Sequence, residues 1–560
     1  MYLDVKEKWV AIKQHVTTGI QSLFPIKDSK GTIDLVGVEF KEPDISTGIQ
    51  RSTLIEGKSL TCNVYGTFVK KDINGKEIER AKVKIMDLPV VTHRGTFIVL
   101  GKDYAVFNQM RLKPGVYTKK SEESGEVTTS FNLGKGLGFK LLMSPSDGVF
   151  YIRFDKSKAS SSTIKVPLYS LLKILGISDG ELKQRWGDRI FEANVGKSHL
   201  VEDAHKLVQS TVYEGNRTGR DVEDLRNYFG GTLLDKETTK ITLGTGYGKV
   251  EAGALLDAAS KMVRVYGGKE DEDDMDSLLF KEVLGVEDHL MLRIEKGIKE
   301  TNVIPKIKRA LQEGKPLKEC IPTNMLSKLM ESFFTKSSLA SPQAEINPIE
   351  VLETNHKITA MGEGGITSEH GIPMNARNLH PSHFGFLDPV RTTESTRVGV
   401  DLRTTHNAVV TNRAIYTTFV NKTGKDVLVK PVDLAGKVVG FAGQEGKKNV
   451  RVLYNGEMLE MPREKVDYWM KDAKDTFTDT SNLTPFMHND QGNRITMASR
   501  FETQAVPLVN REAPLVQVKD GTSSIEHNIG TNFLTPHAPV DGVVTEVKPD
   551  YIMIGKVKVD

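Results

Sequence analysis

The sequence predicts a mixed α+β fold divided into several domains. Segments rich in Val, Ile, Phe and Thr, which favour strands, occur in both halves of the chain. Between them lie segments whose apolar residues recur every three or four positions, as they do on one face of a helix. The chain has 560 residues, which is enough for about four average domains.

Composition limits the class of protein. Lys and Arg total 76 against 73 Asp and Glu, a formal net charge of +3, so basic surface is expected only as local patches. The two cysteines, Cys62 and Cys320, cannot form a disulfide framework or a four-cysteine zinc site, and they fit a reducing compartment. No apolar stretch is long enough to span a bilayer and the start is not a signal peptide, so no membrane partner is expected.

The first part of the chain is expected to be rich in strands. Residues 60–70 and 82–100 predict strands, with Asn74-Gly75 as a hairpin turn because both residues tolerate positive φ. A polar loop is expected over 119–129, followed by a strand region that ends at Phe154.

From Leu168 the apolar period becomes that of a helix. Ser178 and Glu181 have the spacing of a capping box at the start of the next helix. Helices are expected over 200–228, 251–266 and 280–300, and a hairpin rich in Gly and Thr over 230–249.

The last elements complete the mixed pattern. A helix should carry an apolar stripe and begin at Thr323 or Asn324 as N-cap; the stripe is Leu326, Leu329, Met330 and Phe333. Residues 361–400 are rich in Gly, Pro and His and predict a long ordered loop, which is usually functional. Residues 405–470 and 505–560 predict strands.

Several motifs favour a structural over a chemical interpretation. GTGYGK at 244–249 lacks the first glycine and the final Ser or Thr of a phosphate loop, so a turn is favoured. His380 and His383 have metal-like spacing, but no nearby cluster completes four ligands. The acidic run at 269–276 could hold Mg²⁺, although such runs are more often solvated loops. Spacing does not decide whether Lys306, Lys308 and Arg309 touch phosphate or cover a helix face. Since no nucleophile and base stand out together, the residues indicate a binding or scaffold protein.

Four blocks resemble, in the family's order, the N-terminal half of the β subunit of multisubunit RNA polymerases. They are LPVVTHRGTFIVLGKDYAVFNQMRLKPGVY at 88–117, DDMDSL at 273–278, the segment 347–399 with NPIEVLETNHKITAMGEGGIT and RNLHPSHFGFLDPV, and the segment 466–507 with VDYW and LTPFMHNDQGNRITMASRFETQAVP.

The resemblance implies a set of domains. Residues 1–128 and 286–340 would form the protrusion, 129–285 the lobe, 341–420 the fork, 421–475 the external region and 476–560 the start of the hybrid-binding domain. The chain would then be half of a split β subunit, similar to those of giant, phiKZ-like bacteriophages. A truncated gene product or a split organellar gene would also end here.

The implied activity is that of a DNA-directed RNA polymerase, a nucleotidyltransferase, in the assembled complex only. The implied partners are the C-terminal half of β, a β′ chain or chains with the motif NADFDGD, a promoter-specificity factor, DNA template, RNA product and NTPs. Mg²⁺ would be bound by the NADFDGD chain, and no metal or catalytic residue is expected here. The expected location is the host-cell cytoplasm, with packaging in a virion left open.

The resemblance also implies residue roles. Arg494 stands where the family's arginine reaches the NTP triphosphate, and a planar guanidinium suits two-point contact with phosphate. Asn493, Met497 and Gln504 belong to the same NTP-contacting segment. Asp276 matches an aspartate that accepts hydrogen bonds from a non-template guanine. Two cations of the fork, Lys357 and Arg377, are expected to bind DNA.

Two departures from the family fall near the expected active centre. The family's TRER is replaced by residues 367–370, TSEH, and its ETPEGPN by residues 391–397, RTTESTR. We therefore carry over the position of the fork loop but not its individual arginines. The alternative function is a non-catalytic nucleic-acid-binding protein or a decoy of the host polymerase, which loss of residues such as Arg494 would favour. A stand-alone nucleotide-binding enzyme is disfavoured because phosphate-loop and metal motifs are missing from the sequence.

Overall fold

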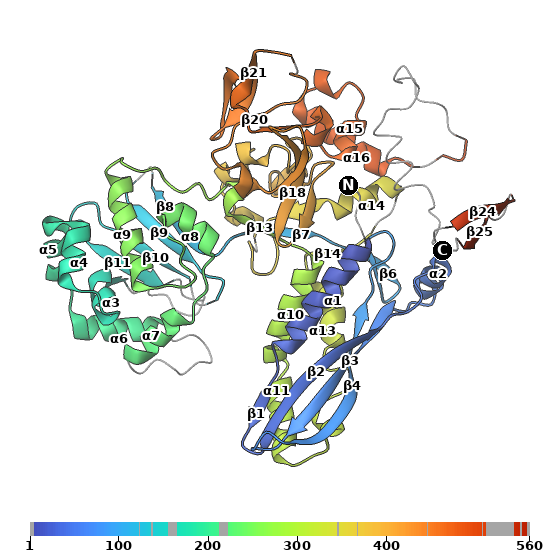
Figure 1. Cartoon of the computed structure of the whole chain (residues 1–560), viewed down its shortest axis with the longest axis horizontal. Helices are drawn as coiled ribbons and strands as arrows, with labels where there is room; N and C mark the ends of the chain where they lie inside the picture. The colour runs from blue at the N-terminus through green and yellow to red at the C-terminus, as the bar shows by residue number, and fades with distance from the viewer. Residues whose placement is uncertain are drawn as a thin grey trace. The chain divides into compact units, whose positions relative to one another are not determined.

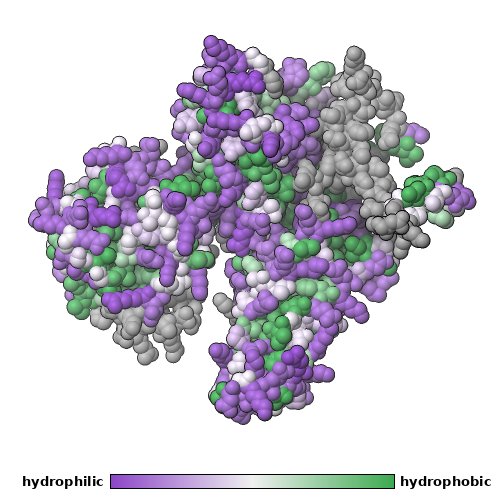
Figure 2. Space-filling model, viewed as in Figure 1, coloured by the Kyte–Doolittle hydropathy of each residue, from purple (hydrophilic) through white to green (hydrophobic). Residues whose placement is uncertain are grey.

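A computed structural model describes residues 5–121, 124–135, 138–154, 165–211, 222–343, 346–366, 368–444, 446–506, 508–510, 542–548 and 552–556. The chain divides into two compact units (Figure 1). Unit 1 comprises Met1–Met110 and Val283–Asp560, and unit 2 is the intervening segment Arg111–Glu282. The face drawn in Figure 2 is mainly hydrophilic, with small apolar patches between.

The first sheet of unit 1 is antiparallel, with its strands in chain order: β1 (Ile26–Asp28), β2 (Gly31–Lys41), β3 (Thr61–Lys71) and β4 (Glu77–Pro89). The predicted hairpin between β3 and β4 is confirmed. The carboxylate of Asp72 accepts hydrogen bonds from the main-chain N–H groups of Asn74 (2.9 Å) and Lys76 (2.8 Å), and Gly75 has φ +82°. An Asp before the turn and a left-handed glycine in it therefore set the register of these strands.

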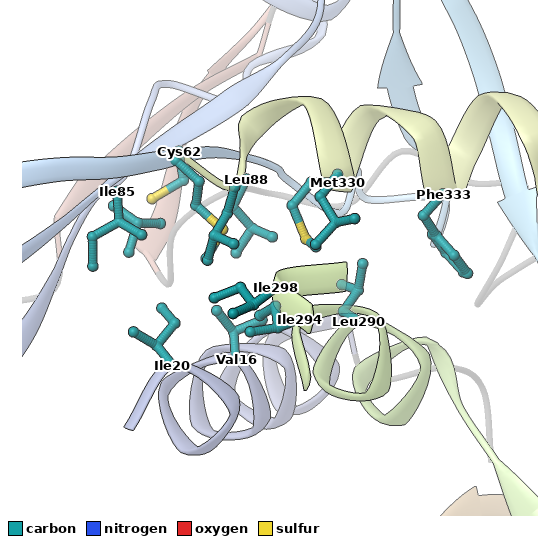
Figure 3. Close-up of a cluster of buried hydrophobic side chains, with 14 of the residues drawn as sticks. Val16, Ile20, Cys62, Ile85, Leu88, Leu290, Ile294, Ile298, Met330 and Phe333 are labelled. Atoms are coloured by element: carbon teal, nitrogen blue, oxygen red, sulfur yellow. The ribbon is translucent and has the colours of Figure 1, made fainter. Parts of the chain in front are cut away.

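Helices pack along this sheet and close the first core of unit 1 (Figure 3). They are α1 (Val5–Gln21), α10 (Val286–Glu300), α11 (Val303–Gln312), α12 (Leu317–Cys320) and α13 (Ser327–Lys336). Their buried apolar side chains meet those of β3 and β4; the labelled members are Val16, Ile20, Cys62, Ile85, Leu88, Leu290, Ile294, Ile298, Met330 and Phe333. The core thus joins residues from both ends of the discontinuous unit.

Two predicted helix starts in this region are wrong. The helix expected from residue 280 begins at Val286, because Lys281–Leu284 form strand β13. The apolar stripe of α13 is confirmed, but neither Thr323 nor Asn324 caps it. Asn324 lies in the preceding turn with φ +56°, and Leu326 occupies the N-cap position without a side-chain hydrogen bond.

Short elements connect this core to the rest of unit 1. They are α2 (Thr47–Ile55), β5 (Phe97–Val99), β6 (Lys102–Val106), β7 (Asn108–Leu112), β14 (Ala340–Pro342), α14 (Pro348–Asn355), β15 (Lys357–Thr359) and β16 (Asp401–Arg403). Strand β15 pairs with β7 in parallel and with β16 in antiparallel orientation. Between β15 and β16, the described residues contain only short 3-10 turns and isolated bridges, as predicted for 361–400.

A second sheet of unit 1 has the order β17-β18-β23-β20-β21-β22, with β19 also paired to β18. Its strands are β17 (Val409–Thr411), β18 (Ala414–Asn421), β19 (Asp426–Val429), β20 (Val439–Gly440), β21 (Asn449–Tyr454), β22 (Glu457–Pro462) and β23 (Tyr468–Trp469). The strand prediction for 405–470 is confirmed. It is followed by α15 (Asp479–Leu483), α16 (Gly492–Gln504) and the antiparallel pair β24 (Gly542–Val547) and β25 (Ile552–Lys556). Residues 511–541 of the segment predicted as strands lie outside the described residues.

Unit 2 is a five-stranded antiparallel sheet with helices packed against it. Its strands are β8 (Gly115–Lys120), β9 (Val127–Asn132), β10 (Phe139–Met143), β11 (Phe150–Phe154) and β12 (Lys165–Pro167). Its helices are α3 (Leu168–Ile174), α4 (Asp179–Trp186), α5 (Asp188–Gly196), α6 (Leu200–Thr211), α7 (Val222–Gly230), α8 (Lys236–Leu243) and α9 (Ala252–Tyr266). Unit 2 runs from Arg111 to Glu282.

Three local predictions in unit 2 are tested. Ser178 caps α4 and accepts from the N–H of Glu181 (3.3 Å), as expected. The loop expected over 119–129 is shorter, because β8 extends to Lys120 and β9 begins at Val127. The hairpin expected over 230–249 is wrong, because this segment contains α8. GTGYGK therefore begins at the C-cap of a helix, where Gly244 has φ +81°, rather than between a strand and a helix as in a phosphate loop.

Candidate functional site

Helix α16 carries the four residues predicted to contact NTP. Asn493, Arg494 and Gln504 are exposed, and Met497 is half-buried. Met497 and Gln504 follow Asn493 by four and eleven residues, so the three lie on one side of the helix, and Arg494 adjoins them. The opposite side packs inward through Ile495, Thr496, Ser499 and Thr503. The structure thus brings the four predicted residues together on a solvent-facing surface.

Arg494 lies in the first turn of α16, where main-chain N–H groups point outward and the helix dipole is positive. Within the described part of the chain, its guanidinium makes one polar contact, to the sulfur of Met497 (Nη1 to Sδ 3.6 Å). The helix dipole does not stabilise a cation at its positive end. An anion bound there would be stabilised both by the dipole and by the Arg494 guanidinium. The arrangement is therefore suited to bind a phosphate group.

Both ends of α16 are fixed to other elements. Thr496 donates a hydrogen bond to the carbonyl of Val390, and Arg500 pairs with Glu394 (Nη1 to Oε2 2.7 Å). At the other end Asn347, the N-cap of α14, donates to the carbonyls of Glu502 (2.7 Å) and Ala505 (2.8 Å). The orientation of Arg494 is thus set by the loop that precedes β16 and by α14.

A buried charge cluster lies behind α16. Glu353 of α14 accepts hydrogen bonds through Oε1 from Arg403 (Nε 3.0 Å) and pairs with Arg391 (Nη2 2.5 Å); all three side chains are buried. Glu502 of α16 is close enough to be affected by Glu353 and Arg391. Burial raises the pKa of Glu502 to about 8, although the Thr484 hydroxyl and Arg391 act against the rise. Both arginines therefore contact Glu353, while Glu502 favours its neutral form at neutral pH.

Asp388 joins the same loop to α15. Its carboxylate accepts from the N–H groups of Val390 (2.8 Å), Arg391 (2.9 Å) and Thr478 (2.7 Å), and from the Ser481 hydroxyl (2.7 Å). Sequence reasoning did not single out Asp388, Glu353 or Glu502. Only their position inside the segments that resemble the polymerase family could have drawn attention to these three residues, because no local sequence pattern marks a buried carboxylate.

Arg377 holds the long loop between β15 and β16 together. It donates to the carbonyls of Glu369 (Nη2 2.6 Å), Thr396 (Nη1 2.5 Å) and Ile372 (Nε 3.4 Å). Gly399 packs against it with φ +71°, and a Cβ there would lie 2.2 Å from the Arg377 carbonyl oxygen. The guanidinium of this predicted DNA-binding residue is thus engaged within the loop.

Lys357 is also engaged internally. Its ammonium lies 2.9 Å from the carboxylate of Asp401 and 4.2 Å from the ring centroid of Phe107, and its side chain is 13% exposed. Burial lowers the pKa of Lys357, while Asp401 acts in the opposite direction. A direct contact between Lys357 and a DNA phosphate would require these partners to be given up.

Asp276 belongs to unit 2, where it is half-buried and its N–H donates to the carboxylate of Asp274 (3.1 Å). The acidic run that precedes it is anchored at Asp273, which accepts from the N–H of Thr118 (2.8 Å) and pairs with the buried Lys261 (2.7 Å). Desolvation raises the pKa of Asp273 in spite of this lysine. The run is therefore partly structural, while Asp276 itself is accessible.

The two histidines that the spacing suggested as ligands have local roles. His380 is the N-cap of a 3-10 turn and accepts from the N–H of Ser382 (3.1 Å), and His383 in that turn is buried. Across the described ranges, no three His, Cys, Asp or Glu side chains gather as a metal site would require. Likewise no helix in the described part of the chain has the length and apolar character needed to cross a bilayer.

Comparison with known proteins bears on this same region. Residues 343–410, which contain Asn347, Glu353, Arg377, Arg391 and Arg403, match the family RNA polymerase Rpb2, domain 3. Along nearly its whole length the chain is similar to DNA-directed RNA polymerase β subunits. The β subunit of Prochlorococcus marinus (strain MIT 9312) is 26% identical over 598 residues, covering 98% of this chain and 52% of the relative. That of Synechococcus sp. (strain ATCC 27144) is 25% identical over 578 residues, covering 96% and 51%. The chain thus spans about half the length of these β subunits, which are subunits of a nucleotidyltransferase.

Proposed function

We propose that this chain is the N-terminal part of a split β subunit of a DNA-dependent RNA polymerase. Its role would be to contribute NTP-contacting and DNA-binding surfaces to template-directed RNA synthesis. The observation that carries the proposal is the exposed face of α16, with Arg494 in the first turn and its supports inside the matched region 343–410. The chain spans about half the length of the bacterial β subunits that it resembles.

The chemistry expected of this chain is substrate binding. Nucleotide addition is an in-line displacement at a phosphate, and cations that neutralise the triphosphate lower its barrier. Arg494 would contact the triphosphate, and Asn493 and Gln504 would offer hydrogen bonds from the same helix face. Met497 would hold the guanidinium in place through its sulfur. Mg²⁺ would be held by the partner chain with NADFDGD, a motif that the sequence of this chain does not contain, and would there help to activate the attacking oxygen.

Residues of unit 1 and of unit 2 would each contribute to DNA binding. Asp276 is proposed to accept hydrogen bonds from an unstacked guanine of the non-template strand, which a half-exposed carboxylate can do. Lys357 and Arg377 are proposed to support DNA binding mainly by ordering the loop between β15 and β16. The bond of Lys357 to Asp401 and those of Arg377 to main-chain carbonyl groups favour this indirect role over a phosphate contact.

The proposed assembly contains further chains. It would include the C-terminal half of β, a β′ chain or chains with NADFDGD, and a promoter-specificity factor, and it would act on DNA, NTPs and RNA in the host-cell cytoplasm. Giant bacteriophages are the proposed origin, since a split β subunit whose family motifs are altered resembles those of phiKZ-like phages. The second candidate is a decoy that binds nucleic acid or host polymerase without catalysis. Retention of Arg494 on an exposed helix face favours the working polymerase.

Affinity purification from the native source tests the proposal. We expect the chain to co-purify with the NADFDGD chain and the second half of β, and the complex to make RNA from DNA, NTPs and Mg²⁺. The purified chain alone should make none. Recovery of the chain with intact host polymerase, and loss of host transcription when it is added, would replace the proposal with the decoy function.

A further inference from the structure

Four exposed cations gather at one end of the β21–β22 hairpin. Lys447 and Lys448 end the loop that leads into β21, and Arg463 and Lys465 belong to the 3-10 turn that follows β22. The N–H of Arg463 donates to the carbonyl of Lys448 (3.1 Å), so the two turns adjoin. We refer to these four residues as the hairpin cations. Figure 2 shows strongly hydrophilic surface where Figure 1 places β20 and β21.

The hairpin cations differ from their neighbours in lacking acidic partners. Lys422 pairs with Asp467 (2.8 Å) and Lys471 pairs with Asp426 (2.7 Å) in the same sheet region. Counting only residues that the structure describes, none of the hairpin cations forms an ion pair. Of the described carboxylates near them, Glu464 is exposed between Arg463 and Lys465, and Glu460 lies opposite Arg451 in the strand register. Asp467, two residues after Lys465, pairs with Lys422. Glu445 of the loop lies outside the described residues. The cations thus exceed the described acids around them.

Hydrogen bonds of Gln444 tie the loop that carries the two lysines to β21 and to Phe441. Gln444 accepts from the N–H of Arg451 (2.8 Å) and donates to the carbonyls of Arg451 (2.9 Å) and Phe441 (3.2 Å). Gly443 and Gly446 have φ +76° and +84°, which allow the tight path that these bonds require. Binding an anion here therefore costs little ordering of the main chain.

Arg463 is held by an aromatic ring. Its guanidinium carbon lies 5.3 Å from the ring centroid of Trp469 on β23. The indole in turn packs on Gly440 of β20, where a Cβ would come within 2.6 Å of the ring. A stacked guanidinium keeps its N–H edges directed outward, and these edges match a phosphate.

We propose that the hairpin cations bind the phosphate backbone of nucleic acid, as a second contact surface of unit 1. An ordered group of unpaired cations with one stacked arginine suits an extended chain of phosphates, which is recognised by charge and spacing without regard to sequence. The surface is made by residues other than those on α16, so NTP contact by α16 and nucleic-acid binding at the hairpin can be measured separately.

Fluorescence anisotropy of the full chain with labelled duplex DNA, single-stranded DNA and RNA of arbitrary sequence, over a series of salt concentrations, tests this assignment. The variant carries Lys447→Gln, Lys448→Gln, Arg463→Gln and Lys465→Gln. Its control removes the same charge from exposed lysines elsewhere in unit 1, through Lys27→Gln, Lys41→Gln, Lys318→Gln and Lys328→Gln. Circular dichroism establishes that each variant is folded. If the fourfold variant does not fold, the pair Lys447→Gln and Lys448→Gln replaces it.

We expect the wild-type chain to bind and the logarithmic salt slope for duplex DNA to fall by about 3 to 4 in the fourfold variant, or by about 2 in the pair, because each lost phosphate contact contributes about 0.9. The control should keep most of the wild-type slope. An equal fall in variant and control would show a diffuse charge effect and overturn the proposal. So would an absence of binding by the wild-type chain. Tighter binding to vesicles of phosphatidylserine than to any nucleic acid, lost in the same variant, would assign the surface to membranes instead.

Discussion

Asn347 and Ala505 are joined by a hydrogen bond of 2.8 Å between the side-chain amide and the main-chain carbonyl. The same amide also donates to the carbonyl of Glu502, and the side-chain oxygen accepts from the N–H of Ile349 (2.9 Å) at the start of α14. The last carbonyls of a helix have no partner within it, so a buried donor at this position is valuable. One side chain therefore fixes the start of α14 and the end of α16, the helix that presents Arg494.

Asn347→Ala should destabilise the chain by about 1–3 kcal/mol, because it removes an N-cap and leaves two carbonyls without a donor. Urea unfolding of the full chain measures this loss. Asn378→Ala, at an exposed loop position, serves as the control and should change little. Equal stability of the two variants would show that α16 is held by other contacts.

Arg494→Ala should leave assembly of the polymerase intact and weaken its use of NTP. A charge-assisted contact with phosphate is worth about 1.5–3 kcal/mol, so the apparent KM should rise, kcat should fall, or both. RNA synthesis by the assembled complex at limiting NTP is the measurement. Arg51→Ala removes an exposed arginine from α2 and should leave these constants unchanged. Wild-type kinetics in an assembled Arg494→Ala complex would refute the substrate role.

Lys261→Met should be one of the most destabilising substitutions in unit 2. Lys261 and Asp273 are 3% and 8% exposed, and Lys261 also donates to the carbonyl of Thr242 (2.6 Å). Removing one member of a buried pair costs about 3–5 kcal/mol, since the other charge stays buried. Adding Asp273→Leu should restore much of the loss, which thermal unfolding can follow. Burial already raises the pKa of Asp273, so the stability that Lys261→Met loses relative to the wild type should grow as pH increases.

Glu502 should make stability depend on pH. Its pKa is about 8 in the folded chain against an ordinary value of 4.5, so the folded state holds a proton that the unfolded state releases. The stability contributed by this group is complete below the ordinary value and is lost as pH rises toward about 8, at up to about 1.4 kcal/mol per pH unit. In thermal melts, the stability of Glu502→Gln relative to the wild type should therefore increase as pH rises through this range. Glu464→Gln, which changes an exposed glutamate, should show no such pH-dependent increase. If Glu502→Gln and the wild type have parallel profiles of melting temperature against pH, the raised pKa of Glu502 is contradicted.

Local patterns predicted the elements whose signals were local. The β3–β4 hairpin follows from β-branched residues around an Asn-Gly turn, and α4 follows from the spacing of Ser178 and Glu181. The segment 236–243 was mistaken for a strand because Thr and Ile favour strands. It is a helix because Asp235 caps it by accepting from the N–H of Thr238 (3.0 Å), Gly244 ends it, and its threonines are buried against the unit.

The candidate site was predictable only in part, because only some of its residues carry a local sequence signal. The motif around Arg494 could be recognised along the chain, and its helical spacing places the four predicted residues together. The cluster behind it joins Glu353, Arg391, Arg403 and Glu502, which come from separate elements and have no shared sequence pattern. Lys357 and Arg377 were expected to face DNA because they are cations, and only the fold reveals the partners that engage them internally.

The insertion of unit 2 between Met110 and Val283 has a consequence for synthesis of the chain on the ribosome. Trp9, Ile12, Val16 and Ile20 of α1 bury their apolar face partly against α10, whose first residue is Val286. This apolar face therefore stays exposed while the whole of unit 2 is translated. Unit 2, by contrast, is one continuous segment and can fold as soon as it leaves the ribosome. Chaperones should accordingly bind the nascent chain at α1, and should be released once α10 leaves the exit tunnel.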